Sequence, residues 1–462
     1  MPGSRQTEDM ATDLHVPHPP RRLPILGDVF SVDRNAPTQS ELALAQQLGP
    51  IYELKFGPAK FFVVSSGKLA TEVNNEERWS KLVAGPFRAM RTKGFTGRGL
   101  LTANSSDPMW SHANSLLGPA FTQDAMRSYH HQMVHAVDDL LALWAAAGAP
   151  VDVVNDMSRL TLEIIGRAGF GRSLGTLNPD YDYGFTDKLR DALKAVSESA
   201  NDFPGSDTIN RKRTRKYEAD KRWLRRYAEG LIDQPDEDVQ ASLLGNMLRG
   251  AADTPALPRE NIVDQAITFL AAGTDTTAGL LSFATYFLAR DEQLLRSAQA
   301  DVVELVGQRP IAFEDVPRLR SIRRILDETL RLWPVAPGYF RIAQVDQRLG
   351  DHEIRRGEVV FVLTLGVHRD TETWGPDAAE FDPDRFLPGR SPKHPDRVFK
   401  PFGTGPRACI GRQFALHEAT LALASIIRSF DIRFPDGIPP LEIDEMLTLK
   451  PHYFGLSLYD RT

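Results

Sequence analysis

Cysteine is almost absent from this chain of 462 residues, because Cys409 is the only one. A single cysteine excludes an internal disulfide and a zinc site built from several thiolates. Cys409 is therefore an inert buried residue, a nucleophile or a metal ligand. Without its context, an inert residue is the default interpretation.

The sequence also lacks a long apolar segment near its start and an excess of basic residues. The first twenty residues carry prolines and scattered charges instead of the apolar stretch of a signal peptide or membrane anchor, so we expect a cytoplasmic protein with no membrane anchor. The net charge of −6 gives no reason to expect nucleic acid as a partner. Hydrophobic residues at 42% and charged residues at 25% are typical of a soluble globular protein.

The spacing of apolar residues predicts a small β region followed by a long helical part. Residues 51–56 and 60–64 predict two strands, with Gly57-Pro58 as the turn of a hairpin. Apolar residues three and four apart predict helices over 123–144, 158–168, 221–232, 262–289 and 319–332. A second β signal covers 342–365, and a last helix is expected over about 410–430.

The lone cysteine stands in a glycine-rich loop just before the last predicted helix, in a segment from Phe402 to Gly411 that reads FGTGPRACIG. Glycines let the backbone pack closely against a flat ligand. Backbone N–H groups, the positive end of the helix and Arg407 favour a thiolate, so we expect the thiol to ionise below its free pKa of about 8.5. A thiolate is the ligand that pushes an iron toward O–O cleavage. A small hydrophobic residue at a helix start remains the alternative.

The pattern Phe-Gly-X-Gly-X-Arg-X-Cys-X-Gly resembles the haem-binding signature of the cytochrome P450 family, and the resemblance extends over residues 23–451. It implies a mainly α fold with small β-sheets and haem b between the long central helix and the cysteine-bearing helix. It also implies one catalytic domain over 1–462, with a β-rich region at about 45–100, a helical region at about 105–335 and a haem-binding region at about 336–462. Cys409 would bind the iron, and the other residues implied to hold the cofactor are Arg407, Phe402, Gly403, Trp110, Lys81, Gly411 and Ala272.

A second segment, AGTDTTAG from Ala272 to Gly279, interrupts the apolar sequence of the predicted helix over 262–289. Glycine and threonine are poor helix formers, so we expect a distorted turn, widened by a hydroxyl that bonds to a carbonyl of the same helix. Taken alone, Asp275 and Thr276 are ordinary polar residues bonded to backbone. The segment resembles the family's oxygen-activation motif, which implies that Thr276 hydrogen-bonds the iron-bound dioxygen and that Asp275 passes protons and water to it.

A third group of residues resembles the ion network of the same family. Glu328 and Arg331 stand three positions apart, a spacing that alone is common among surface ion pairs. With Arg385 they match the family's Glu-X-X-Arg pair and its arginine partner, which implies a structural network behind the haem.

The tryptophan that meets a haem propionate in the family is matched by Trp110, but the usual basic residue four positions later is here Asn114. This departure leaves the propionate to Trp110, His112, Lys81 or Arg407. Arg341 also matches an arginine that many bacterial members direct at a propionate, and an ordinary strand surface charge is an equal alternative.

Several stretches resemble the haem domain of the bacterial self-sufficient fatty-acid hydroxylases. The arginine and tyrosine that bind the fatty-acid carboxylate there correspond to Ala59 and Val63 here, which leaves Lys60 as the nearest cation. The phenylalanine over the haem corresponds to Leu101. By this alignment the substrate pocket is lined by Leu101, Phe95, Val335, Ala336 and Leu447, together with Ala272, and core packing is the alternative for each of them.

The resemblance implies a haem-thiolate monooxygenase that hydroxylates or epoxidises a lipophilic substrate, fatty acid or fatty-acid-like, with O2. Too few residues follow Cys409 for a flavin domain, so we expect a separate electron donor, a ferredoxin or flavodoxin with its reductase and NAD(P)H as the ultimate source. The alternatives are a tailoring monooxygenase of a secondary-metabolite pathway, a peroxide-driven or rearranging member, and a non-catalytic haem-bearing recruitment module.

A basic run over 211–216, continued by Lys221, Arg222, Arg225 and Arg226, is left without a role by this interpretation. It could meet an acidic redox protein or an anionic head group, and a solvated helix face is the default interpretation.

Overall fold

The computed structural model describes residues 16–148, 150–200, 210–235, 239–240, 242–251, 253–390 and 395–461. The expectation about the first twenty residues falls mainly on residues 1–15, which lie outside these ranges. Within the described ranges, no helix combines the length and the apolar character that crossing a membrane requires.

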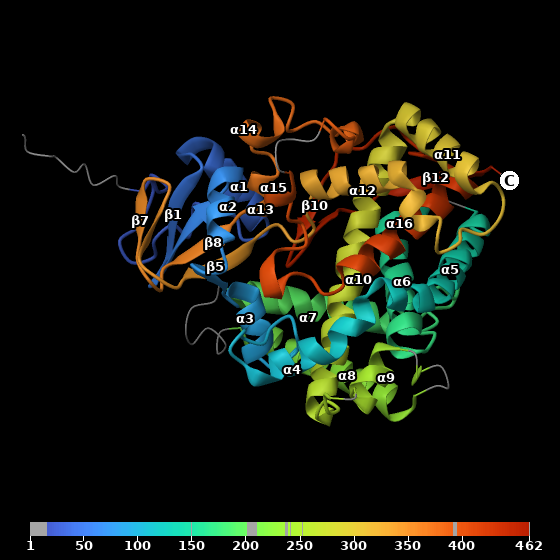
Figure 1. The fold of residues 1–462 in the computed structure, drawn as a ribbon, viewed down its shortest axis with the longest axis horizontal. Coiled ribbons are helices and arrows are strands. Elements are labelled where there is room, and N and C mark those ends of the chain that lie inside the picture. The colour runs from blue at the N-terminus through green and yellow to red at the C-terminus, as the bar shows by residue number, and fades with distance from the viewer. Residues whose placement is uncertain are drawn as a thin grey trace, which may run out of the picture.

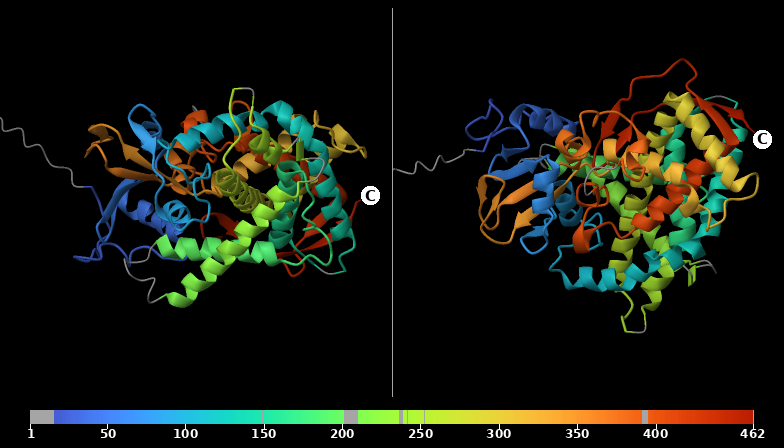
Figure 2. Two further views of the ribbon diagram at one scale, coloured as in Figure 1. Left: turned by 90° about the horizontal axis from the view of Figure 1, so that it is seen from below. Right: turned by 45° about the horizontal axis from the view of Figure 1, so that its top comes forward.

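A β-rich region and a helical region lie on opposite sides of the molecule in Figure 1 and in both views of Figure 2. The helical region is built around α10 (Arg259–Arg290), a helix of 32 residues. Between Ile262 and Leu288 it is buried on almost every side, as expected for a helix with apolar residues all round. It ends at Asp291, whose carboxylate caps the following helix by accepting the N–H of Leu294 at 2.9 Å.

The other helices pack around α10 or against the sheets. In chain order they are α1 (Pro37–Leu48), α2 (Gly67–Val73), α3 (Gly85–Thr92), α4 (Pro108–Leu117), α5 (Gln123–Ala145), α6 (Val153–Ile164), α7 (Gly184–Ala200), α8 (Arg211–Asp233), α9 (Leu243–Arg249), α11 (Glu292–Val306), α12 (Arg320–Leu332), α13 (Thr364–Val367), α14 (Thr371–Trp374), α15 (Pro395–Val398) and α16 (Arg412–Ser429). The architecture is therefore mainly helical, as the sequence predicts.

In the described ranges the strands form four small sheets. The largest has the order β1 (Ile51–Phe56), β2 (Ala59–Val64), β8 (Val359–Val362), β5 (Tyr339–Ala343) and β3 (Trp79–Lys81), with only β2 and β8 parallel. The others are the pairs β6 (Gln347–Leu349) with β7 (His352–Ile354) and β10 (Ile443–Glu445) with β11 (Leu449–Pro451), and a sheet of β4 (Val151–Asp152), β12 (Gly455–Asp460) and β9 (Phe430–Arg433). The predicted hairpin over 51–64 is confirmed, because Phe56 pairs with Ala59 across the Gly57-Pro58 turn.

The expected distortion at Ala272 to Gly279 is wrong, because α10 runs through this segment as an uninterrupted α-helix. The Thr276 hydroxyl donates to the Ala272 carbonyl at 2.7 Å, yet the helix stays regular. The irregular turn is on the neighbouring element instead, where a π-helical turn over Ile165–Gly169 follows α6. Ile165 of this turn lies 3.5 Å from where a Cβ of Gly273 would be, so the turn packs directly on α10.

The start of α1 depends on a residue near the other end of the chain. Its N-cap position is Ala36, which has no side-chain acceptor. The carboxylate of Glu445, at the end of β10, accepts the backbone N–H and the hydroxyl of Thr38, each at 2.7 Å. A negative charge at this helix end is also favoured by the helix dipole.

The three side chains of the predicted ion network lie together in the structure. Arg331 donates to both carboxylate oxygens of Glu328, at 2.6 and 2.7 Å, and the Arg385 Nε lies 3.6 Å from Glu328. Arg331 also donates to the carbonyls of His368 and Ala378. Its side chain is fully buried, so α12 is joined to the segment before the cysteine loop by charge-assisted bonds out of water.

We expect Arg331→Met to lower the free energy of unfolding by about 3–5 kcal/mol, because it leaves the Glu328 charge buried without its partner. Urea unfolding followed by circular dichroism measures the change. The control on the same helix is Arg320→Met, because Arg320 is exposed; its effect should stay below about 1 kcal/mol. Equal effects of the two variants would contradict the network's role.

A second buried acid, Glu418, lies between α16 and α10. Glu418 is buried against Thr277, its Oε1 has no hydrogen-bond partner among the described residues, and burial raises its pKa well above the usual value, opposed by the bond with Thr277. The folded state therefore keeps a proton that the unfolded chain releases above about pH 4.5. The stability that this proton contributes is fully present below that pH and is lost as the pH rises toward the raised pKa.

Glu418→Gln should remove this dependence, because an amide keeps the shape without titrating. We expect the variant to gain stability relative to the parent as the pH rises from 5 to 8, by up to about 1.4 kcal/mol per pH unit. Urea unfolding at pH 5, 6, 7 and 8 measures it, with the exposed Glu304→Gln on α11 as the control. Parallel stability curves for parent and Glu418→Gln would refute the assignment.

Candidate active site

The loop before α16 holds Cys409 in a tight turn. The Cys409 N–H donates to the Phe402 carbonyl at 2.8 Å, which closes the loop. Gly405 has a φ of +68°, and a side chain there would collide with the Glu76 carboxylate. The positive φ therefore favours glycine at this point, where the loop passes close to the Glu76 side chain.

The Cys409 side chain is accessible to a water-sized probe, although protein atoms surround it on most sides. Loss of bulk water around the sulfur raises the pKa of the thiol, against the lowering by the Gly411 backbone N–H, Lys81 and Arg412. The expectation that the thiol ionises below its free pKa is therefore wrong for the protein groups alone, because desolvation outweighs these neighbours. Arg407, which we also expected to favour the thiolate, is not among the groups that lower the pKa.

Basic side chains gather beside this cysteine. Lys81 on β3 lies opposite Arg341 on the neighbouring strand β5. Burial, together with repulsion from Arg407 and Arg341, lowers the pKa of Lys81 to about 8. Burial also lowers the pKa of Arg407 to about 10. Arg341 donates to Glu76 at 2.7 Å, but its buried Nε has no hydrogen-bond partner among the described residues. Lys81, Arg341 and Arg407 thus bring three positive charges close together where burial removes much of their water, which favours binding of an anionic group.

Two side chains of α4 behave differently at this site. The ring of Trp110 lies under the Arg407 guanidinium at 4.7 Å, so these predicted residues meet. The His112 Nε2 lies 2.8 Å from the Pro255 carbonyl instead. Of the substitutes considered for the missing basic residue at Asn114, His112 is therefore engaged elsewhere.

The middle of α10 is the accessible part of this otherwise buried helix. Between Asn261 and Leu288, only Ala272, Gly273, Asp275 and Thr276 are more than minimally exposed. The aromatic rings of Phe121 and Phe269 stack at 5.7 Å between this helix and the cysteine loop, where Phe121 also lies near Gly411. The two predicted motifs are thus joined by one stacked pair.

The Asp275 carboxylate faces the β10–β11 hairpin. The Thr448 hydroxyl donates to it, and the Lys450 ammonium lies 3.3 Å away. The strand comes this near because Gly279, one turn along the same face, has no side chain: its Cβ would be 3.0 Å from the Leu449 carbonyl oxygen. Sequence reasoning missed Thr448 and Lys450, since nothing local in the sequence marks a partner 173 or 175 residues away.

The residues predicted to line a substrate pocket differ in exposure. Ala336 is exposed, and Leu101 and Leu447 are half-buried beside the main core. Phe95 and Val335 are buried, at 0% and 4% exposure, so the alternative of core packing describes them better than contact with a substrate.

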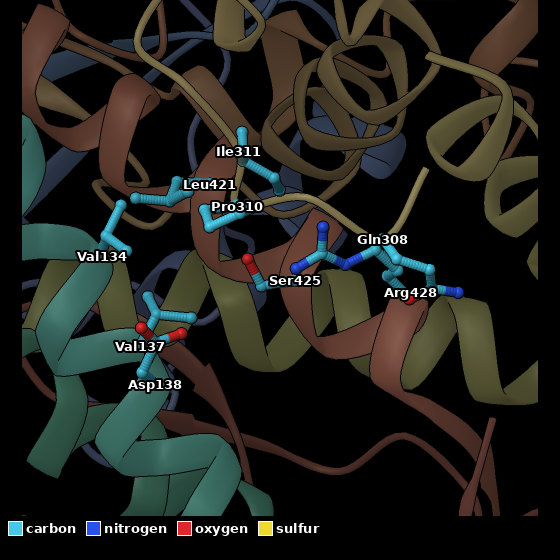
Figure 3. A pocket seen from close by; sticks show the side chains of 9 residues that line it. All are labelled: Val134, Val137, Asp138, Gln308, Pro310, Ile311, Leu421, Ser425 and Arg428. Atoms are coloured by element: carbon cyan, nitrogen blue, oxygen red, sulfur yellow. The ribbon is translucent and has the colours of Figure 1, made fainter. Parts of the chain in front are cut away.

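A separate pocket lies between α5, the segment after α11 and α16, as Figure 3 shows. It is lined by Val134, Val137, Asp138, Gln308, Pro310, Ile311, Leu421, Ser425 and Arg428. None of the predicted site residues is among them.

A haem fits the residues present around Cys409. Its iron requires a soft ligand, and the accessible sulfur of Cys409 provides one. Its two propionates require cations, and Lys81, Arg341 and Arg407 are short of anionic partners. Among the described residues no group of three or more His, Cys, Asp and Glu side chains is placed to hold a metal ion, so Cys409 would act as a single protein ligand.

Comparison with known proteins identifies the family. The family model described as Cytochrome P450 matches residues 17–458. The bifunctional cytochrome P450/NADPH–P450 reductase 1 of Bacillus subtilis (strain 168) is 36% identical over 456 residues, which cover 96% of this chain and 42% of the relative. A self-sufficient cytochrome P450 monooxygenase of Phanerodontia chrysosporium is 34% identical over 455 residues, covering 96% and 43%. The chain thus spans less than half the length of these curated relatives. With a family match over nearly its whole length, the chain belongs to the cytochrome P450 family.

Proposed function

We propose that the chain is a haem-thiolate monooxygenase domain that inserts one oxygen atom of O2 into a lipophilic substrate, a fatty acid or a molecule like one. The observation that carries this proposal is the accessible Cys409 sulfur beside Lys81 and Arg407, on the loop whose sequence matches the family signature. The relative from Phanerodontia chrysosporium is named as a monooxygenase, which supports the reaction class.

The protein side chains would hold the cofactor from several elements. Haem bound through the Cys409 thiolate supplies the activation of dioxygen. Lys81 and Arg407, with Arg341 behind them, would pair with the propionates, and Trp110 would support Arg407 from below. Phe402, Gly403, Gly411 and Ala272 would border the ring.

Asp275 and Thr276 would move the protons that this chemistry consumes. The Thr276 hydroxyl donates its own proton to the Ala272 carbonyl, so its oxygen remains free to accept another. Adjacent helix positions face different directions, so a proton that leaves Asp275 needs an intervening water molecule or a rotated side chain to reach Thr276. Between turnovers, Thr448 and Lys450 would keep the Asp275 carboxylate bonded to the β10–β11 hairpin.

The half-buried Leu101 and Leu447 would exclude water and select an apolar substrate. The first hairpin, where the resemblance places the site for a fatty-acid carboxylate, offers no unpaired cation at Lys60. Lys60 there already pairs with Glu358 at 3.0 Å and Glu53 at 3.4 Å, and Val63 is fully buried. We infer that the substrate is held mainly by its apolar part.

Electrons would come from a donor outside this sequence, a ferredoxin or flavodoxin with its reductase. Two Bacillus relatives are named as bifunctional cytochrome P450/NADPH–P450 reductases, which supports NAD(P)H as the ultimate source of electrons.

An absorbance titration of the purified ferric protein with fatty acids of graded chain length tests the substrate class. We expect a saturable shift from low spin to high spin that depends on chain length, because an apolar chain in the pocket displaces water. Haem without any shift across the series would contradict the fatty-acid assignment and favour a dedicated lipophilic metabolite of a biosynthetic pathway. A purified protein that binds no haem would contradict the proposed function itself.

Thr276→Ala should lower the fraction of electrons recovered in product by at least about tenfold, because proton transfer by a positioned group contributes factors of 10² or more. Product and peroxide formed per NAD(P)H consumed are measured together. The matched control is Thr274→Ala, two positions away on the same helix, whose buried hydroxyl has no partner among the described residues. Unchanged coupling in Thr276→Ala would rule out its role in proton delivery.

A further inference from the structure

The first half of α10 carries a polar stripe on an otherwise apolar buried helix. Asn261, Asp264, Gln265 and Thr268 stand at positions i, i+3, i+4 and i+7, which places them on one face. All four are at most 5% exposed. Buried polar groups at such positions require partners, and the partners identify what the stripe holds.

The partners belong to the segment over 93–102, which connects α3 to α4. Asp264 accepts the backbone N–H of Arg98 at 2.8 Å, and Asn261 donates to the Arg98 carbonyl at 3.1 Å. Gln265 accepts the N–H of Leu100 at 3.0 Å. The stripe therefore binds the backbone of this segment at two positions, Arg98 and Leu100.

Glycines make this close approach possible. Gly97 has a φ of +48°, and a side chain there would collide with the Asp264 carboxylate. A side chain on Gly99 would collide with the Thr268 hydroxyl. The segment is shaped to lie directly on the stripe.

The basic helix α8 clamps the same segment from the other side. Arg225 donates to the second Asp264 oxygen at 2.8 Å and reaches the Phe95 carbonyl at 3.4 Å. One turn earlier, the Lys221 ammonium donates to the Lys93 carbonyl at 2.8 Å. Lys221 and Arg225 thus do not belong to a solvated face, whereas the neighbouring Arg222 is exposed.

The clamp reaches the candidate active site at Leu100. The N–H of Leu100 is held by Gln265, and its carbonyl accepts from Arg407 of the cysteine loop at 3.1 Å. The next residue is Leu101, the half-buried side chain proposed to face substrate. The placement of Leu101 is therefore fixed by α10 on one side and by the cysteine loop on the other.

We propose that Asp264 is a positioning residue: paired with Arg225, it clamps segment 93–102 onto α10 and sets how often Leu101 moves aside to admit a bulky lipophilic molecule. The inference rests on the proposed function only in assigning Leu101 to the substrate site. Asp264 itself touches no reacting group.

Hydrogen exchange of the haem-loaded protein tests the clamp directly. In Asp264→Asn we expect the Arg98 amide to exchange at least about tenfold faster, because it loses a bond to a buried charge. The Leu100 amide, which Gln265 still holds, should change less. Unchanged exchange at Arg98 would overturn the proposal, whatever the state of the active site.

Binding of 4-phenylimidazole to the ferric haem, followed by stopped-flow absorbance, tests the effect on access. A clamp that gates entry makes association and dissociation faster by the same factor, so we expect both rate constants of Arg225→Met to rise about tenfold with Kd unchanged within about twofold. Arg225→Lys should restore most of the slow rates, because it keeps the charge opposite Asp264. The matched control is Arg222→Met, on the exposed side of the same helix.

Equal rate constants for Arg225→Met and Arg222→Met would overturn the gating role. A change in Kd with unchanged exchange at Arg98 would do the same, since it would indicate an altered pocket and not a looser clamp. Failure of the parent protein to bind 4-phenylimidazole at all would instead count against the proposed function, and the exchange experiment would still decide on the clamp.

Discussion

Burial of α10 is the constraint on which the other parts of the structure depend. Hydroxyl side chains in such a helix can bond to carbonyls of the same helix, as Thr276 does, but a buried carboxylate needs donors from other elements. Asp264 is satisfied by segment 93–102 and α8, Asp275 by the β10–β11 hairpin, and Glu418 of α16 bonds to Thr277. The two acids in the middle of this helix thus specify where neighbouring elements must lie. The same positions carry the proposed proton transfer and the proposed control of access.

The distribution of charge around Cys409 follows a different principle. Lys81, Arg341 and Arg407 are brought together although they repel one another; burial, and after it repulsion from Arg407 and Arg341, lowers the pKa of Lys81. Such an arrangement costs free energy in the protein alone and is offset by a bound anion. The cluster is therefore organised for its ligand more than for the stability of the chain, which is common at functional sites.

The sequence predicts local features of this protein well and distant pairings poorly. The hairpin at 51–64, the long central helix and the cysteine loop follow from the spacing of residues close together in the chain. Lys450 opposite Asp275 and Arg225 opposite Asp264 do not, since tertiary packing alone brings them together. Two predictions drawn from neighbours in sequence are wrong: desolvation by the surrounding protein raises the thiol pKa, and the segment from Ala272 to Gly279 stays α-helical within a helix that packing buries.

The capping of α1 by Glu445 has a consequence for how the protein is made. Thr38 leaves the ribosome 407 residues before the carboxylate that its N–H and hydroxyl bind. At synthesis rates of about 5–20 residues per second, that interval lasts roughly 20–80 s. During this time α1 lacks the carboxylate that caps its start, and the largest sheet stays incomplete until β8 has been synthesised. The hairpin that restrains Asp275 is thus among the last parts to emerge, and its arrival joins the first helix of the fold to the completed core.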